Sequence, residues 1–129
     1  MDGRELGAIF AGGAAGAVLR VWLGLALPAG DVGWPWLIFA INITGSAALA
    51  YFATRLQERL PQSTYRRPLL GTGFCGAYTT FSTMQVEIVK MLDDGRGGQA
   101  VSYAAVSLVA GYAVIWLTTA AARRSRLVL

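Results

Sequence analysis

The sequence predicts an all-α membrane protein with four transmembrane helices, the third of them broken in mid-membrane. Of the 129 residues, 55% are hydrophobic and only 14% are charged, whereas a typical soluble domain carries about a quarter charged residues. The charges cluster and leave long uncharged stretches. One of these stretches carries a run of small and hydroxylated residues. Lipid offers such groups no hydrogen-bond partner, so the run must pack against protein or line a polar path.

Four stretches reach the length of about 20 apolar residues that a membrane span needs. They cover about residues 6–27, 34–54, 69–92 and 100–122. The links between them are short and polar, so we expect a single four-span domain over residues 1–129. The first stretch is too long for a signal-peptide core and follows no basic segment, which predicts a retained span.

Basic residues predict the orientation. With four spans, the N-terminus, the second link and the C-terminus share one side. Of the 11 basic residues, 8 lie on that side, 2 on the other and Arg20 within the first span. The two sets are Arg4, Arg55, Arg59, Arg66, Arg67, Arg123, Arg124 and Arg126, against Lys90 and Arg96. The positive-inside rule therefore predicts a multi-pass protein of the cytoplasmic membrane with both termini cytoplasmic. This topology explains the basic balance without a nucleic-acid partner.

The break is predicted within residues 71–84, which are rich in Gly, Ser and Thr. Glycines and the β-branched pair Thr79 and Thr80 lower helix stability. A break would free backbone carbonyls near Gly76 and Thr79, and free carbonyls can hold a small cation.

The residues after the break suit an anion. A broken helix would turn Phe81, Ser82 and Thr83 towards a cavity, where hydroxyls can donate hydrogen bonds. The edge of a phenyl ring carries partial positive charge and can also face an anion. Simple packing remains the alternative role for Phe81.

Two polar residues in the other spans have open roles. Asn42 in the second span must meet protein, water or a ligand, because an unpaired carboxamide in lipid is costly. It is either a donor to an anion or a bond between helices. Arg20 faces protein or water, in a structural or vestibule position or in contact with an ion. Snorkelling to the interface is a further possibility.

The first and last spans carry patterned small and polar residues. Gly12-x-x-x-Gly16 predicts close approach of another helix, with pore lining as the alternative. Tyr103 and Ser107 are four residues apart and share one helical face. Most of the four tryptophans are expected to anchor at the membrane interface. These are Trp22, Trp34, Trp36 and Trp116.

The missing groups argue against an enzyme. The chain has no histidine, the commonest general base. No span holds a carboxylate pair, and Glu87 is the sole candidate for a proton relay. A four-span multidrug antiporter would need a carboxylate deep in an early span, and residues 6–27 have none. A membrane interaction subunit without transport is a third interpretation, tested by whether the chain conducts at all.

Together these residues resemble the small bacterial fluoride channels, the Fluc or CrcB family, over essentially the whole chain. The most specific motif is Gly73-x-x-Gly76-x-x-Thr79-Thr80-Phe81-Ser82-Thr83. The other motifs are Gly12-Gly13-x-x-Gly16-Ala17-x-x-Arg20, Asn42-x-x-Gly45-Ser46 and Tyr103-x-x-x-Ser107, in the same order along the chain.

The resemblance implies an antiparallel, dual-topology dimer of four-helix subunits with two fluoride pores. Its implied role is export of toxic fluoride down the electrochemical gradient. It also implies a sodium ion at the dimer centre, held by backbone carbonyls. The positions carried over are Asn42 and Phe81 for fluoride, Tyr103 and Ser107 for a polar track, and Gly76 and Thr79 for sodium. Ser82, Thr83 and Met84 complete the expected fluoride pore.

The chain departs from the family pattern in several ways. Met84 stands where the motif usually has a second Phe, Ile38 where a Thr is common, and Gly111 where a hydroxyl is frequent. The polar track is therefore thinner. The bias of 8 basic residues against 2 also conflicts with insertion in both orientations. A homodimer is expected, and a heterodimer with a paired homologue is the alternative hypothesis.

Overall fold

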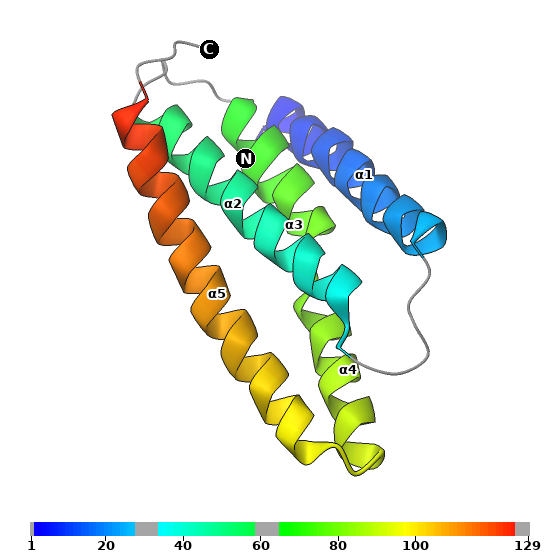
Figure 1. Ribbon diagram of the computed structural model, residues 1–129. Coiled ribbons are helices and arrows are strands. Elements are labelled where there is room, and N and C mark those ends of the chain that lie inside the picture. The colour runs from blue at the N-terminus through cyan, green and yellow to red at the C-terminus, as the bar shows by residue number, and fades with distance from the viewer. Residues whose placement is uncertain (1, 28–33, 59–64, 126–129) are drawn as a thin grey trace.

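The computed structural model describes residues 2–27, 34–58 and 65–125, and every regular element in these ranges is helical. The elements are α1 (Gly3–Ala26), α2 (Trp36–Glu58), the π-helix η1 (Pro68–Cys75), α3 (Gly76–Tyr78), α4 (Phe81–Asp93) and α5 (Gly97–Arg124). Figure 1 shows them as a bundle of tilted helices. The prediction of an all-α chain is confirmed.

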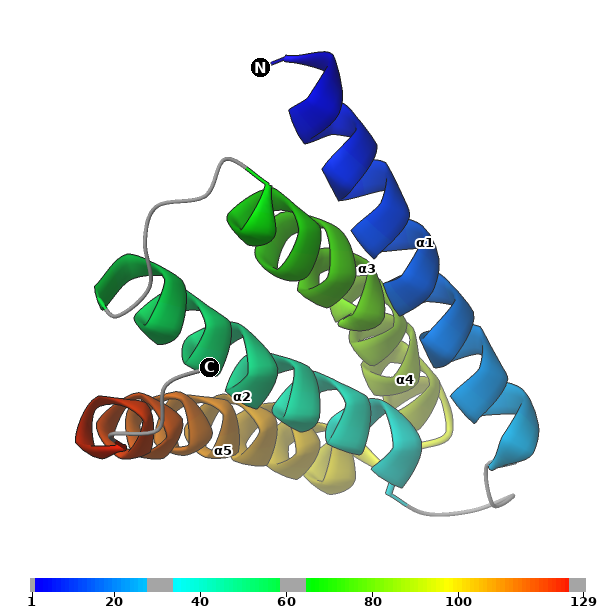
Figure 2. The same ribbon diagram turned by 90° about the horizontal axis from the view of Figure 1, so that it is seen from above.

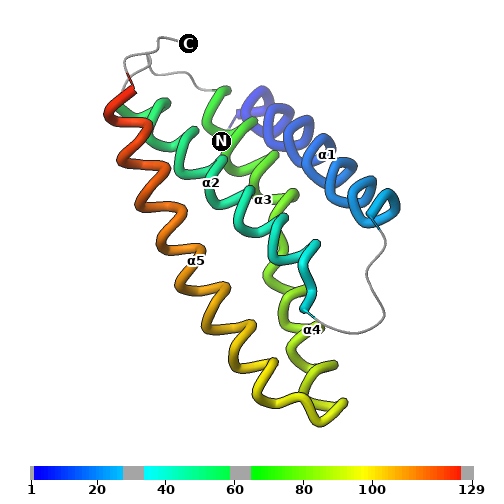
Figure 3. The backbone as a smooth tube through the Cα atoms, viewed as in Figure 1, coloured from blue at the N-terminus to red at the C-terminus, as the bar shows by residue number. Residues whose placement is uncertain are grey.

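Three of these helices, α1, α2 and α5, are long and apolar enough to cross a membrane. The expected span at residues 69–92 falls on η1, α3 and α4, which follow one another along one column of the bundle (Figures 1 and 3). The column is interrupted at Thr79 and Thr80, whose backbones are extended. The predicted break is therefore present, and it lies between α3 and α4.

The helices pack in two groups that share the broken column. Helix α1 packs against η1 and α3, while α5 packs against α2 and α4. Figure 2 shows α1 and α5 on opposite sides, with the column between α1 and α2. The C-terminal ends of α2 and α5 lie at one end of the bundle, and the turn between α4 and α5 lies at the other. Of the basic residues predicted to be cytoplasmic, Arg59 and Arg126 lie outside the described residues.

Glycines allow α1 to approach the broken column closely. A Cβ on Gly12 would overlap the carbonyl oxygen of Leu69, and one on Gly16 would overlap that of Phe74. A Cβ on Gly73 would in turn meet the α1 backbone. This contact confirms helix packing as the role of Gly12-x-x-x-Gly16, as small residues at i and i+4 predict.

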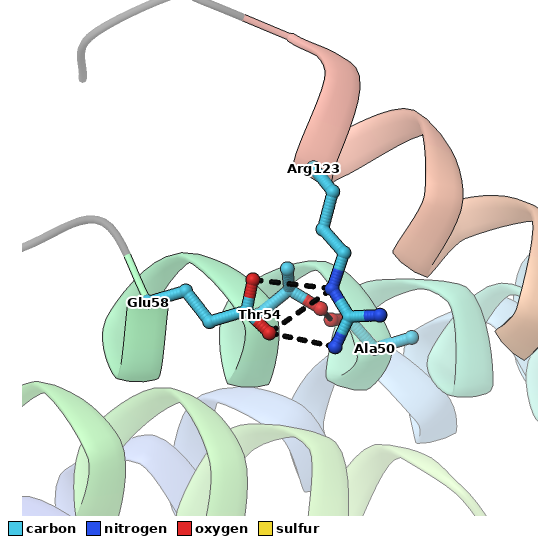
Figure 4. A network of polar contacts seen from close by, with 4 residues as sticks. All are labelled: Ala50, Thr54, Glu58 and Arg123. Atoms are coloured by element: carbon cyan, nitrogen blue, oxygen red, sulfur yellow. Dashed lines mark hydrogen bonds and ion pairs between the residues drawn. The ribbon is translucent and has the colours of Figure 1, made fainter.

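Polar contacts hold the ends of α2 and α5 together (Figure 4). The Arg123 guanidinium donates to the Glu58 carboxylate from Nε at 3.0 Å and from Nη2 at 2.7 Å. Thr54 turns its hydroxyl back to the Ala50 carbonyl at 2.8 Å. Arg55, only 6% exposed, donates from Nη2 to the Ser125 hydroxyl at 3.1 Å. The bidentate pair joins residues 65 positions apart, which fixes how the two helices end relative to each other.

Candidate functional site

The side chain of Asn42 holds the break in place. Its Nδ2 donates to the Thr80 carbonyl at 3.0 Å, and its Oδ1 accepts from the Thr80 N–H at 2.8 Å. One carboxamide thus satisfies both backbone groups of an extended residue that is 6% exposed. Asn42 therefore joins α2 to the break between α3 and α4 by hydrogen bonds. A carboxamide has a second N–H, which leaves one donor for a further acceptor.

The break also changes the hydrogen bonding of two carbonyls. In a continuous helix the Thr80 N–H would bond the Gly76 carbonyl, but here it donates to Asn42. The Thr83 N–H would likewise bond the Thr79 carbonyl, but it donates to Thr80 Oγ1 at 3.2 Å. The carbonyls of Gly76 and Thr79, which the sequence singled out as cation ligands, have both lost their helical donors.

Arg20 reaches the same break from α1. Its Nη1 lies 3.5 Å from the Thr79 carbonyl oxygen, a long distance for a hydrogen bond. The guanidinium therefore lies beside the break rather than at the end of α1. This places a positive charge next to a carbonyl that the break has freed.

The residues at 81–84, which the sequence analysis placed together in one expected pore, lie in different surroundings in the first turn of α4. Phe81 is 70% exposed, so its ring does not pack in the core of this chain. Ser82 is exposed and lies 3.4 Å from Thr80 Oγ1, while Thr83 accepts a bond from Thr80 Oγ1 at 3.0 Å. Met84 is half-buried and packs inward against the core that contains Tyr103. Phe81 and Met84 thus lie in different surroundings.

Two hydroxyls of α5 are buried without a partner. Tyr103 has 0% exposure and belongs to a core cluster with Met91 and Ala100. The Tyr103 OH and the Ser107 Oγ both lack a hydrogen-bond partner among the described residues. Leaving a buried polar group unpaired costs about 1–3 kcal/mol. Two such groups, one helical turn apart on α5, could each donate a hydrogen bond to a polar ligand.

The sequence did not reveal two further features of the site. Thr44 and the Tyr78 hydroxyl lie 2.9 Å apart and tie α2 to α3. A Cβ on Gly45 would overlap the Thr79 side chain, so this glycine lets α2 approach the break. The sequence does show Gly45 three residues after Asn42 on the same helix. Its contact with Thr79 could not be predicted, because Thr79 lies far along the chain.

The departures from the family pattern have clear positions. A Cβ on Gly111 would meet nothing within 4 Å, so this position could accept a larger residue. Ile38 is half-buried on α2, one turn before Asn42.

The family described as "CrcB-like protein, Camphor Resistance (CrcB)" matches residues 7–119. The chain belongs to the CrcB family. It is 55% identical over 126 residues to "Fluoride-specific ion channel FluC 1" of Mycolicibacterium paratuberculosis, covering 97% of this chain and 95% of that protein.

Other relatives carry the same name. The Mycobacterium bovis protein "Fluoride-specific ion channel FluC 1" is 52% identical over 98% of this chain and 96% of its own length. "Fluoride-specific ion channel FluC 2" of Geobacillus kaustophilus is 41% identical over 88% of this chain and 89% of its own length. The family predicted from the sequence motifs is confirmed. With its apolar helices, this CrcB-family chain is a multi-pass membrane protein.

Proposed function

We propose that this chain is a fluoride-selective channel that exports fluoride across the cytoplasmic membrane down its electrochemical gradient. The observation that carries the proposal is the pair of buried, unpartnered hydroxyls of Tyr103 and Ser107 on one face of α5. They belong to an apolar bundle in a family whose relatives are named as fluoride-specific channels. The chain is accordingly a channel and not an enzyme.

The donors suit a small anion. An anion that leaves water needs hydrogen bonds in place of its hydration shell. Hydroxyls of Tyr103 and Ser107 and the spare N–H of Asn42 are such donors. In the first turn of α4, Phe81, Ser82, Thr83 and Met84 complete the proposed pore set. Phe81 offers a ring edge on the exposed surface of the subunit.

The functional unit in this proposal is an antiparallel, dual-topology dimer of four-span subunits. The carbonyls of Gly76 and Thr79 support it, because the break removes their helical donors and lipid supplies none. The two subunits are copies of this chain or, given the basic bias, this chain and a paired homologue. Reporter fusions at the C-terminus decide: equal labelling from both sides supports the homodimer, and one-sided labelling supports the pair.

A sodium ion at the dimer centre is part of the proposal. Among the described residues no group of three or more Asp, Glu, Cys or His could hold a metal, so the ligands would be carbonyls. The carbonyls of Gly76 and Thr79 fit, because the break removes their helical donors and hard cations prefer oxygen. Sodium would supply structural support between subunits. Arg20, beside Thr79, would then hold a vestibule or structural position.

The experiment is fluoride efflux from liposomes that contain only this chain, measured with a fluoride electrode and compared with chloride efflux. Fluoride flux without chloride flux supports a selective channel formed by one gene product. Co-expression with a paired homologue separates an obligate partner from a non-conducting protein when the chain alone is silent. Assembly in lithium in place of sodium tests the cation, and we expect lithium to fail.

A further inference from the structure

We infer that the indole N–H of Trp34 is an additional hydrogen-bond donor to the permeating anion, beside Tyr103 on the path that the α5 hydroxyls mark. This inference rests on the proposed channel function. It adds a donor that the sequence motifs did not contain. It also gives a role to a tryptophan that its position near a span end would assign to interfacial anchoring.

The first support is the environment of the indole nitrogen. Trp34 Nε1 is buried and has no hydrogen-bond partner among the described residues. An indole N–H can only donate, and a buried one usually finds an acceptor. An anchoring tryptophan would turn this group to headgroups or water. Trp36, two residues later, is 69% exposed and fits that role, whereas Trp34 does not.

The second support is the contact with Tyr103. The two rings meet edge to face, with centroids 5.3 Å apart and planes at 89°. Trp34 also packs edge to face on Phe39 at 6.1 Å, which holds the indole in a fixed orientation. Trp34, Met84 and Ile88 all pack against the core cluster that contains Tyr103. The indole is therefore a preorganised part of the Tyr103 site.

The third support is the accumulation of one kind of group. Trp34 Nε1, Tyr103 OH and Ser107 Oγ all lack partners, and each can donate a hydrogen bond. Two of these groups belong to one edge-to-face ring pair, and the third lies one turn along α5. An anion could accept a hydrogen bond from each of them. A cation would leave the indole N–H without a partner, because this group can only donate a hydrogen bond and cannot ligate a cation.

The test compares Trp34→Phe with Trp36→Phe in the liposome efflux assay. Trp34→Phe keeps an aromatic ring but removes the N–H, and we expect fluoride efflux to fall about tenfold or more, as for a lost bond to a charged group. Trp36→Phe should stay within about twofold of wild type, since its indole is exposed. Ser107→Ala serves as a reference for the path itself.

A second measurement detects binding directly. Indole N–H signals of the ¹⁵N-labelled full chain are followed by NMR during addition of sodium fluoride, with sodium chloride as the control salt. We expect the Trp34 signal to shift with fluoride alone and the Trp36 signal to stay in place. This readout is made on the wild-type protein, so it holds even where Trp34→Phe fails to fold.

The outcomes separate this inference from the channel proposal. In one outcome, fluoride efflux falls in Ser107→Ala but not in Trp34→Phe, and fluoride does not shift the Trp34 signal. This result leaves the channel proposal in place and overturns the role of Trp34. A wild-type chain that conducts no fluoride, alone or with a paired homologue, overturns the channel and this inference together. A Trp34 signal that moves equally with both salts assigns the indole to water or to general anion contact, which also overturns the inference.

Discussion

Replacement of Asn42 by Ala tests whether one carboxamide holds the helix break. The change removes both bonds to the Thr80 backbone, at 3.0 and 2.8 Å. Hydrogen bonds between membrane helices contribute about 0.6 kcal/mol on average and up to about 1.7, so two contribute about 1–3 kcal/mol. The better helix propensity of Ala returns about 0.6 kcal/mol. The free energy of unfolding should therefore fall by roughly 0.4–2.4 kcal/mol.

The assay is unfolding of the purified chain in a denaturing-detergent titration, followed by tryptophan fluorescence. Ser46→Ala is the matched control, because Ser46 lies one turn after Asn42 on α2 and is also half-buried. It should leave the unfolding free energy within about 0.5 kcal/mol of wild type, as expected for a site away from a special contact. If Asn42→Ala and wild type unfold with the same free energy, the carboxamide does not stabilise the helix break.

Asn42→Asp separates the two roles of the residue. The carboxylate still accepts from the Thr80 N–H, but its second oxygen would face the Thr80 carbonyl, and it has no donor for an anion. We expect fluoride efflux to be abolished, because a fixed negative charge also repels the anion. Retained wild-type flux would remove Asn42 from the path, whatever its effect on stability.

Three further substitutions test the packing of α1 on η1, the ion pair between the ends of α2 and α5, and the polar track along α5. Gly16→Ala should prevent close packing of α1 on η1 and abolish folded protein in size-exclusion chromatography, whereas Gly7→Ala, whose Cβ meets nothing, should behave as wild type. Arg123→Gln removes an exposed bidentate pair with Glu58 and should lower the thermal midpoint only slightly; a large loss would contradict the weak contribution of exposed ion pairs. Gly111→Ser adds a hydroxyl into open space and should preserve folding, and we expect fluoride efflux to rise.

Local patterns explain what the sequence could predict. The all-α class follows from uncharged stretches of span length, and the break from glycines followed by Thr79 and Thr80. The packing of α1 follows from the spacing of Gly12 and Gly16. Each of these signals lies within one stretch of chain, so periodicity and propensity suffice to detect it. The same reasoning found Tyr103 and Ser107 on one face of α5.

Contacts between distant segments explain what the sequence left open. Asn42 and Thr80 are 38 residues apart, and no local pattern states that they pair. The outward position of Phe81 and the inward position of Met84 depend on how α4 rotates after the break. Trp34 looked like an interfacial anchor because its place in the chain is near a span end. Its packing on Tyr103 and the burial of its indole nitrogen are visible only in the structure.

The site has two parts that differ in hydrogen bonding. The polar groups of Thr80 at the helix break have partners, whereas buried polar groups of α5 and Trp34 have none within the part of the chain that the structure describes. At the break, the Thr80 N–H and carbonyl pair with Asn42, and its hydroxyl caps α4 through Thr83. A break that satisfies its central residue so fully persists without a ligand. Among the described residues, the unpaired buried side-chain atoms other than Arg55 Nε belong to α5 and to Trp34. In the proposed channel these unpaired groups remain costly until an anion arrives, so we expect them, together with the spare N–H of Asn42, to supply the donors that select it.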